Sequence, residues 1–323
     1  GVVKGGTTSL FAYLTQSPDF VAPERKELRV WRPVRAPLAN GVGYTLENYT
    51  ARFPLINPRD FRVTGEASPA YFYSVVAAAF FAKHEIRAIL LLRHPVARWL
   101  SEFDMRVSQK HSVGSPWRLA SHNFTEHVHA VAKVCARCTR RQMLEAFVAG
   151  KKGDCSVSPV AMQSWYDLFL PNWLPRLSTH LHIEVSESFF SDPRAALARI
   201  GRFLSLPPHE YNTSVAFNTR QSRGINIKAA APSRQHQPPA PASGLCAAPA
   251  ALRLAQSLCD ESVEMLRRQL AGTDVAVPLS WSVPPTSCPR NALQSVNTMN
   301  MMNTINNTIN TMNNTTDREG CRE

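Results

Sequence analysis

The stretch "GVVKGGTTSLFAYLTQSP" (residues 1–18) places a lysine, two glycines and three hydroxyl residues between an apolar fragment and a helical pattern. Paired glycines let a backbone approach an anion, and the first N–H groups of a helix point toward it. In a Walker A loop the lysine follows the second glycine, whereas here Lys4 precedes Gly5 and Gly6. We therefore predict an anion-binding loop over residues 4–9 that is not a Walker A loop. An ordinary tight turn is the alternative.

Short apolar runs followed by helical patterns recur along the chain. In the last such unit Asp192 is a good helix cap and Pro193 suits a first helical turn. Alternating strands and helices predict a doubly wound α/β fold, in which ligands gather at the carboxyl ends of parallel strands. The predicted strands are residues 2–3, 61–69, 86–95 and 181–186, and the clearest helices are residues 8–15, 95–109, 191–208 and 251–270.

The chain of 323 residues is strongly basic, with 36 Lys and Arg against 24 Asp and Glu and a net charge of +12. Such a charge favours anionic partners: nucleic acid, a nucleotide or an acidic polysaccharide. No RNP-type aromatic motif or zinc-finger spacing supports nucleic acid, so we expect none. No stretch reaches the roughly 18 apolar residues of a membrane span. Because the chain does not begin with Met, we expect missing upstream sequence, and any membrane anchor would lie there.

Seven cysteines are present, and "CARC" (135–138) has the spacing of a metal or redox site. There is no second Cys-x-x-Cys, and no strand leads into a helix around it, so a disulfide among Cys135, Cys138 and Cys155 is the stronger interpretation in an oxidising compartment. Glycosylation sequons also fit a luminal or secreted chain. The informative sequons are at Asn48, Asn123 and Asn212, while those at Asn306, Asn313 and Asn314 lie in Asn/Thr-rich sequence where matches arise by chance.

The apolar run "AILLL" ends in Arg93-His94-Pro95. A P-loop kinase would place an acidic residue at such a strand end to hold magnesium. A cation there instead favours direct contact with a second phosphate, and we expect no metal. Ser101, on the helix that begins at Pro95, can turn toward the same ligand. Taken singly these are ordinary surface residues, but together with residues 4–9 they predict a ligand with two separated phosphate groups.

The segment "ERKELRVW" (24–31) places Glu27 among cations shortly after the first helix. A carboxylate in this position is a candidate general base, or a salt-bridge partner of Arg25, Lys26 or Arg29. Spacing alone favours the salt bridge.

The segments "GVVKGGTTSL", "KELRVW", "GEASPAYF" and "AILLLRHPVARWLSEF" resemble, in order and spacing, the sulfotransferases that use 3′-phosphoadenosine 5′-phosphosulfate (PAPS), in particular the Golgi enzymes that sulfate glycosaminoglycans. Within that family, "KELRVW" and "GEAS" are most similar to N-acetylgalactosamine 4-sulfate 6-O-sulfotransferase. The resemblance implies a P-loop-like three-layer α/β fold, with a central parallel sheet flanked by helices. It covers residues 1–282, including a Pro/Ala-rich loop at 229–250, and residues 283–323 are expected to form a disordered low-complexity tail.

The same resemblance implies roles for individual residues. Glu27 falls on the catalytic base, and Lys4 lies beside the bridging oxygen on which negative charge grows. Arg29 stands where the family usually has histidine, which puts the role of that histidine in doubt. The 5′-phosphosulfate of the PAPS donor is expected at Lys4, Gly5, Gly6, Thr7, Thr8 and Ser9, and its 3′-phosphate at Arg93 and Ser101.

The resemblance also implies the acceptor and the compartment. We expect sulfate transfer to a hydroxyl of a carbohydrate, an acidic or already sulfated polysaccharide, in the Golgi lumen. The alternatives are transfer to protein tyrosine or to a small alcohol, a catalytically impaired nucleotide- or glycan-binding module, and a nucleotide kinase, against which the lysine position and the missing acidic strand end argue. The residues expected to hold the acceptor are Arg29, Arg32, Arg137, Arg140 and Arg141, with Lys151 and Lys152.

Overall fold

The computed structural model describes residues 1–31, 45–60, 62–108, 119, 121–177, 179–214 and 247–285. By their contacts, the residues of the chain form two compact units. The first comprises Gly1–Pro33, Asn40–Arg93 and Phe169–Gly244, and the second Val34–Ala39, His94–Leu168 and Leu245–Glu323. Residues 286–323 of the predicted tail, most of the Pro/Ala-rich loop and Arg32 lie outside the described residues, and the domain boundary at residue 282 stays a prediction.

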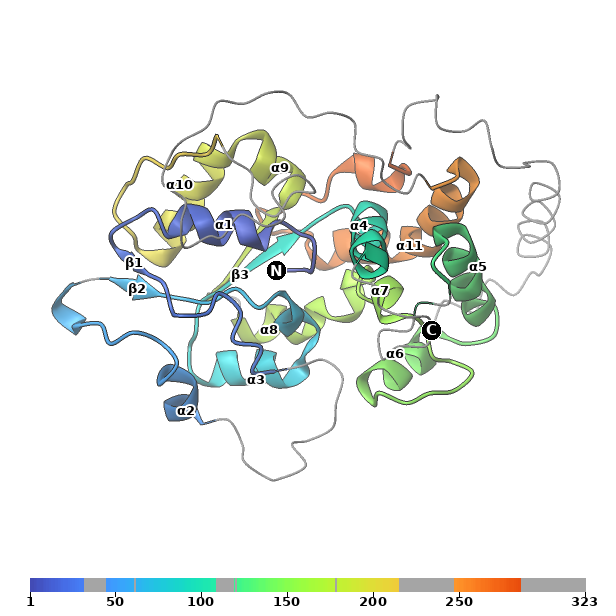
Figure 1. The fold of residues 1–323 in the computed structure, drawn as a ribbon, viewed down its shortest axis with the longest axis horizontal. Helices are drawn as coiled ribbons and strands as arrows, with labels where there is room; N and C mark the ends of the chain where they lie inside the picture. Colours follow the sequence, from blue (N-terminus) through green and yellow to red (C-terminus); the bar gives the residue numbers. More distant parts are fainter. Residues whose placement is uncertain are drawn as a thin grey trace. The chain divides into compact units, whose positions relative to one another are not determined.

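The strands of the first unit form two parallel pairs (Figure 1). β1 (Phe20–Val21) pairs with β2 (Val63–Thr64), and β3 (Ala88–Leu92) pairs with β4 (Leu181–Val185). The last three residues of β3 are buried leucines, as expected of a parallel strand covered on both faces. The strands predicted around β3 and β4 are confirmed, whereas the one predicted at residues 61–69 is only two residues long.

The structure has no strand at residues 2–3, and a turn begins at Val3, so the strand predicted there is wrong. Two hydrogen bonds nevertheless hold this segment beside β3. The backbone nitrogen of Val2 donates to the oxygen of Leu91 at 2.9 Å, and the terminal nitrogen of Gly1 to that of Ile89 at 3.3 Å. Residues 1–2 therefore run along β3, and the glycine loop follows directly after Val3.

The helices of the first unit follow the expected order. The helix predicted after residue 192 is confirmed: the Asp192 side chain accepts a hydrogen bond from the Ala195 nitrogen at 3.0 Å, and Pro193 begins the helix. The α-helices are α1 (Thr7–Leu14), α2 (Leu46–Thr50), α3 (Val75–Lys83), α8 (Leu174–Leu177), α9 (Ser186–Ser191) and α10 (Pro193–Leu204), and short 3-10 helices span Pro58–Asp60, Pro69–Tyr73 and Leu170–Asn172.

The apolar core of the first unit holds the site's main elements in place. Leu10 and Phe11 of α1 pack in one cluster with Leu91 of β3, Phe189 of α9 and Leu197 of α10. Buried apolar side chains of this size each contribute roughly 1.5–3 kcal/mol. The middle of α1 is therefore packed against β3, α9 and α10. Residues of β2 and β3 also line a largely apolar cavity of about 1040 Å³.

The second unit is helical in its described part. The helices predicted from Pro95 and around residues 251–270 are confirmed as the two longest of this unit. Its α-helices are α4 (Pro95–Ser108), α5 (Phe124–Cys135), α6 (Arg140–Val148), α7 (Pro159–Met162) and α11 (Pro249–Gln269), with 3-10 helices at Tyr166–Leu168 and Leu279–Ser282. α11 packs against α4 and α5, and buries Trp281 of the last 3-10 helix in this unit.

Candidate active site

The loop between residue 3 and α1 disfavours a side chain at two positions, Gly5 and Gly6. Gly6 has a φ of 93°, and a β-carbon there would lie 2.7 Å from the Phe190 ring. A β-carbon on Gly5 would lie 3.0 Å from the Val2 carbonyl oxygen and 3.1 Å from that of Leu91. A side chain at Gly6 would be strained by that φ, and one at Gly5 would crowd two backbone oxygens. The paired glycines therefore suit the path of this loop.

The loop presents the N-terminus of α1. Gly6 is the cap residue, and no side chain within the described residues caps the helix by a hydrogen bond. The Ser186 hydroxyl, directly after β4, donates to the Gly5 carbonyl oxygen at 2.6 Å. This hydrogen bond holds the loop in place. Uncapped first-turn amides carry the positive end of the helix dipole. With the hydroxyls of Thr7 and Thr8 beside it, this N-terminus fits an anion.

The motifs "KELRVW" and "GEASPAYF" are adjacent segments. Residues 26–30 are hydrogen-bonded to residues 66–71, about forty positions away, by one bond between backbone groups and three from backbone nitrogens to side-chain oxygens. The bonds are Ala67 N to Lys26 O at 2.7 Å, Leu28 N to Glu66 Oε2 at 3.4 Å, Arg29 N to Ser68 Oγ at 3.0 Å and Val30 N to Tyr71 Oη at 2.9 Å. The backbone around Glu27 is thereby held on both sides.

Glu27 lies between two cations. Its Oε1 is 2.9 Å from Lys26 Nζ and its Oε2 is 2.7 Å from an Arg29 terminal nitrogen, which confirms the salt-bridge interpretation. Burial by itself would raise the pKa of Glu27, but Lys26 and then Arg29 outweigh it and hold that pKa below its usual value. The side chain keeps 23% exposure, so the ionised carboxylate is accessible to a second molecule.

Lys26 connects Glu27 to the loop. Besides its ion pair with Glu27, its ammonium donates to the Thr8 hydroxyl on α1 at 3.2 Å. From the sequence, Lys26 was expected only as a salt-bridge partner, and its contact with Thr8 was not predicted. In the sequence, the only signal for a role of Lys26 is its position directly before Glu27. Spacing does not reveal a hydrogen bond to a residue 18 positions away.

Glu66 is a second carboxyl group of the site that the sequence analysis did not single out. It accepts from the Leu28 nitrogen and, at 3.4 Å, from the Tyr49 hydroxyl. Burial raises its pKa above the usual range, although hydrogen bonds from Tyr71, Ser68 and Leu28 act in the opposite direction. Glu66 therefore holds the backbone that follows Glu27, while Glu27 itself carries the lower pKa.

Arg93, directly after β3, lies beside the loop. One terminal nitrogen donates to the Lys4 carbonyl oxygen at 3.0 Å, and the residue is half-buried. Lys4 has a φ of 66°, an unusual conformation for a residue with a side chain. The strand end and the loop therefore meet, as expected in a parallel sheet. Ser101 lies half-buried on α4 of the second unit.

The basic residues predicted to hold an acceptor differ in their surroundings. Arg140 is only 9% exposed, and one of its terminal nitrogens is 2.7 Å from each carboxylate oxygen of Asp167. We therefore do not include Arg140 among the proposed acceptor-binding residues. Arg141 is exposed and pairs with Glu145 at 3.0 Å. Arg29, Arg137, Lys151 and Lys152 are exposed, and Arg32 lies outside the described residues.

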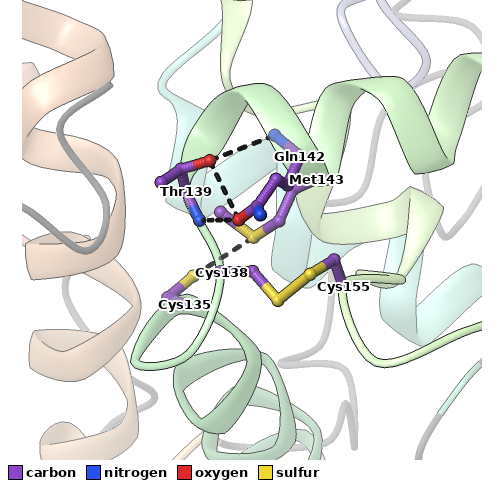
Figure 2. The surroundings of a disulfide bond; sticks show 6 residues. All are labelled: Cys135, Cys138, Thr139, Gln142, Met143 and Cys155. Carbon is purple, nitrogen blue, oxygen red and sulfur yellow. Dashed lines mark hydrogen bonds between the residues drawn. A yellow bond between two sulfur atoms is a disulfide. The ribbon is translucent and has the colours of Figure 1, made fainter.

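The two cysteines of "CARC" differ in their bonding (Figure 2). Cys138 forms a disulfide with Cys155, with an S–S distance of 2.10 Å, so the disulfide interpretation is confirmed for this pair. Cys135 is buried and outside this disulfide, and its sulfur lies 4.0 Å from that of Met143. Among the described residues no group of three His, Cys, Asp or Glu is arranged to hold a metal ion.

Two known proteins that are similar to this chain are both sulfotransferases. No protein-family model matches the sequence. Over 156 residues, 47% of the chain, the sequence is 30% identical to the membrane-associated sulfotransferase kil1 of Dictyostelium discoideum, and the match spans 31% of that protein. The chain thus corresponds to about a third of the length of this curated relative. No helix within the described residues is long and apolar enough to cross a membrane.

The structure is similar to the crystal structure of a sulfotransferase from Alicyclobacillus acidocaldarius. The TM-score is 0.54 at 17% sequence identity, over 87% of this chain and 96% of that chain. The chain therefore has the sulfotransferase fold, and the predicted α/β class is confirmed. Its glycine loop and the parallel pair β3–β4 are the parts of that fold on which the candidate site is built.

Proposed function

We propose that this protein is a sulfotransferase that moves the sulfuryl group of PAPS to a hydroxyl of a carbohydrate. The observation that carries the proposal is the placement of Glu27, which Lys26 connects to the first turn of α1. A candidate base thus lies beside a candidate anion site. The similarity to two sulfotransferases supports the same reaction class.

The donor would be held by the loop and the end of β3. The 5′-phosphosulfate would lie at Lys4, Gly5, Gly6, Thr7, Thr8 and Ser9, where the uncapped helix N-terminus offers amide donors. Arg93 is bonded to the Lys4 carbonyl, which puts a second cation near the same ligand. We propose that Arg93, together with Ser101, binds the 3′-phosphate.

The reaction would be an in-line displacement at sulfur. The acceptor oxygen forms a bond to sulfur while the bond from sulfur to the bridging oxygen of the donor breaks. Glu27 takes the proton of the acceptor hydroxyl, and Lys4 stabilises the negative charge that develops on the bridging oxygen. The lowered pKa of Glu27 keeps this carboxylate ionised and able to accept the proton at neutral pH.

The proposed acceptor is an acidic or sulfated polysaccharide. The net charge of +12 and the exposed Arg29, Arg137, Arg141, Lys151 and Lys152 support it, because exposed cations attract anionic chains. We propose Arg32 as a further contact. The Cys138–Cys155 disulfide and the exposed sequon residues Asn48, Asn123 and Asn212 support an oxidising compartment, and we propose the Golgi lumen.

Replacing Lys4 by alanine is expected to remove donor binding. The ammonium makes a charge-assisted contact that is lost in the variant, so the affinity for 3′-phosphoadenosine 5′-phosphate should fall at least about tenfold. Calorimetric titration measures this, and transfer of radiolabelled sulfate should fall in parallel. Lys83→Ala, an exposed lysine at the end of α3, makes the same charge change and should bind normally. Normal nucleotide binding by Lys4→Ala would contradict the donor site.

The acceptor is tested by offering radiolabelled PAPS with glycosaminoglycans, other sulfated polysaccharides, tyrosine peptides and small alcohols, followed by chemical mapping of the new ester. We expect the label on a carbohydrate hydroxyl, at rates that fall with added salt because charged contacts are screened. Label on tyrosine or a small alcohol would overturn the carbohydrate proposal. Tight nucleotide binding without sulfate release to any acceptor would indicate a binding module in place of an enzyme.

A further inference from the structure

The Lys26 ammonium lies between the candidate base, Glu27, and the first turn of α1. It lies 2.9 Å from Glu27 Oε1 and 3.2 Å from the Thr8 hydroxyl, and its side chain is only 16% exposed. The Lys26 carbonyl is also bonded to the Ala67 nitrogen, which fixes the backbone from which the side chain reaches α1. A partly buried ammonium with polar contacts to two segments responds to charge on either one.

Charged side chains of two described segments lie around Glu27. Lys26 and Arg29 belong to its own segment, Glu66 comes from the adjacent segment through the Leu28 nitrogen, and α1 contributes the neutral Thr8 hydroxyl through Lys26. The Arg29 side chain is 67% exposed and pairs with Glu27 from the solvent side. Lys26 is therefore the cation that faces both the base and the start of α1.

This arrangement raises a chemical problem for a base. A general base works best when its pKa is near the working pH, whereas the two cations hold the pKa of Glu27 below its usual value. An anion at the N-terminus of α1 would compete for the Lys26 ammonium, since opposite charges attract strongly where water is partly excluded. Part of the cationic stabilisation of Glu27 would then be withdrawn.

We propose that Lys26 is a positioning residue that couples donor binding to the base: the donor's anionic group at α1 draws the ammonium toward Thr8, which leaves Glu27 a stronger base. This inference rests on the proposed function. It makes the base strongest when the donor is present, which limits unproductive proton uptake by the free protein.

Proton uptake on nucleotide binding tests the coupling without any need for turnover. The affinity and proton uptake of 3′-phosphoadenosine 5′-phosphate are measured calorimetrically at about pH 5, near the usual range of a carboxyl group, in buffers of different ionisation enthalpy. Subtracting the uptake of Glu27→Gln removes the contribution of the nucleotide's own phosphates. Wild type should take up additional protons, because binding raises the pKa of Glu27.

Three variants complete the experiment. Lys26→Met should lose the additional proton uptake and bind the nucleotide about tenfold more weakly, as expected for a lost charge-assisted contact. Lys26→Arg should retain most of both. Arg25→Met removes an exposed cation of the same segment and is the matched control, because it should keep the nucleotide affinity and the uptake.

Unchanged affinity and uptake in Lys26→Met would overturn the inference. If Lys4→Ala loses nucleotide binding in the same assay, the donor site stands and only the role of Lys26 is wrong. If Lys4→Ala also binds normally, the donor site itself is wrong. A misfolded Lys26→Met chain is recognised by a lowered unfolding midpoint, and the Lys26→Arg result then decides.

Discussion

Glu27→Gln is expected to lose about 10²- to 10⁴-fold in kcat while binding the nucleotide as wild type does, which is the range for a positioned general base. The amide is nearly the same size as the carboxylate and still accepts a hydrogen bond from Lys26, but it does not take the acceptor proton. Donor binding depends on the loop at residues 4–9 and should survive. Single-turnover transfer of radiolabelled sulfate and calorimetric titration measure the two quantities separately.

The pH dependence provides a second check on Glu27. Because Lys26 and Arg29 outweigh burial, the pKa of Glu27 in the free protein lies below the ordinary 4.5. A base with a lowered pKa is ionised and active above that pKa, and its activity is lost as the pH falls through it. The acidic limb of kcat/KM for the donor should therefore lie below pH 4.5. Glu24→Gln, an exposed neighbour, is the matched control, and a normal kcat in Glu27→Gln would show that the base is another group.

Arg98→Met is expected to cost about 3–5 kcal/mol of unfolding free energy, the usual effect of removing one partner of a buried ion pair. The Arg98 side chain is fully buried on α4, 2.5 Å from Glu102 and 2.9 Å from the Ser164 hydroxyl, and it also donates to the Val160 carbonyl. The variant leaves a buried carboxylate with less compensation and a buried carbonyl without this donor. Urea unfolding followed by fluorescence measures the loss.

The control for Arg98 is an ion pair of the same type and spacing on the surface. Arg141 and Glu145 on α6 are 82% and 63% exposed, so Arg141→Met should change the unfolding free energy by less than about 1 kcal/mol. Arg98→Lys, which keeps the charge but not the planar fork of donors, should fall between the two. Equal stability of Arg98→Met and Arg141→Met would show that burial does not determine the cost.

Sequence patterns located the helices better than the strands. Capping residues and turn-forming prolines act within one helical turn. Asp192 and Pro193 therefore predict the start of α10 directly. β1 and β2 have two residues each, and their pairing depends on chain segments more than forty positions apart. A two-residue strand has too few positions to show a periodicity. For the same reason the apolar residues 2–3 predicted a strand where the structure has only hydrogen bonds to β3.

In the candidate site, too, local features were predicted from the sequence and contacts between distant segments were not. The glycine loop and Glu27 were recognised from local sequence and from resemblance to a family. Lys26 and Glu66 were missed because their partners are Thr8, Tyr49 and the Leu28 backbone, which only folding brings near. Arg140 was predicted to face an acceptor, yet its partner Asp167 lies 27 positions away and takes it into the interior of the second unit.

By itself the sequence determined the local features of this protein: the paired glycines of the turn at residues 4–9, the capped helices and the excess of positive charge. These depend on backbone conformation and composition, which neighbouring residues set. Only the tertiary structure decided which cations remain exposed, that Cys138 pairs with Cys155, and that Lys26 lies between Glu27 and α1. Burial and pairing depend on segments distant in the chain, and the chemistry of a charged side chain follows from them.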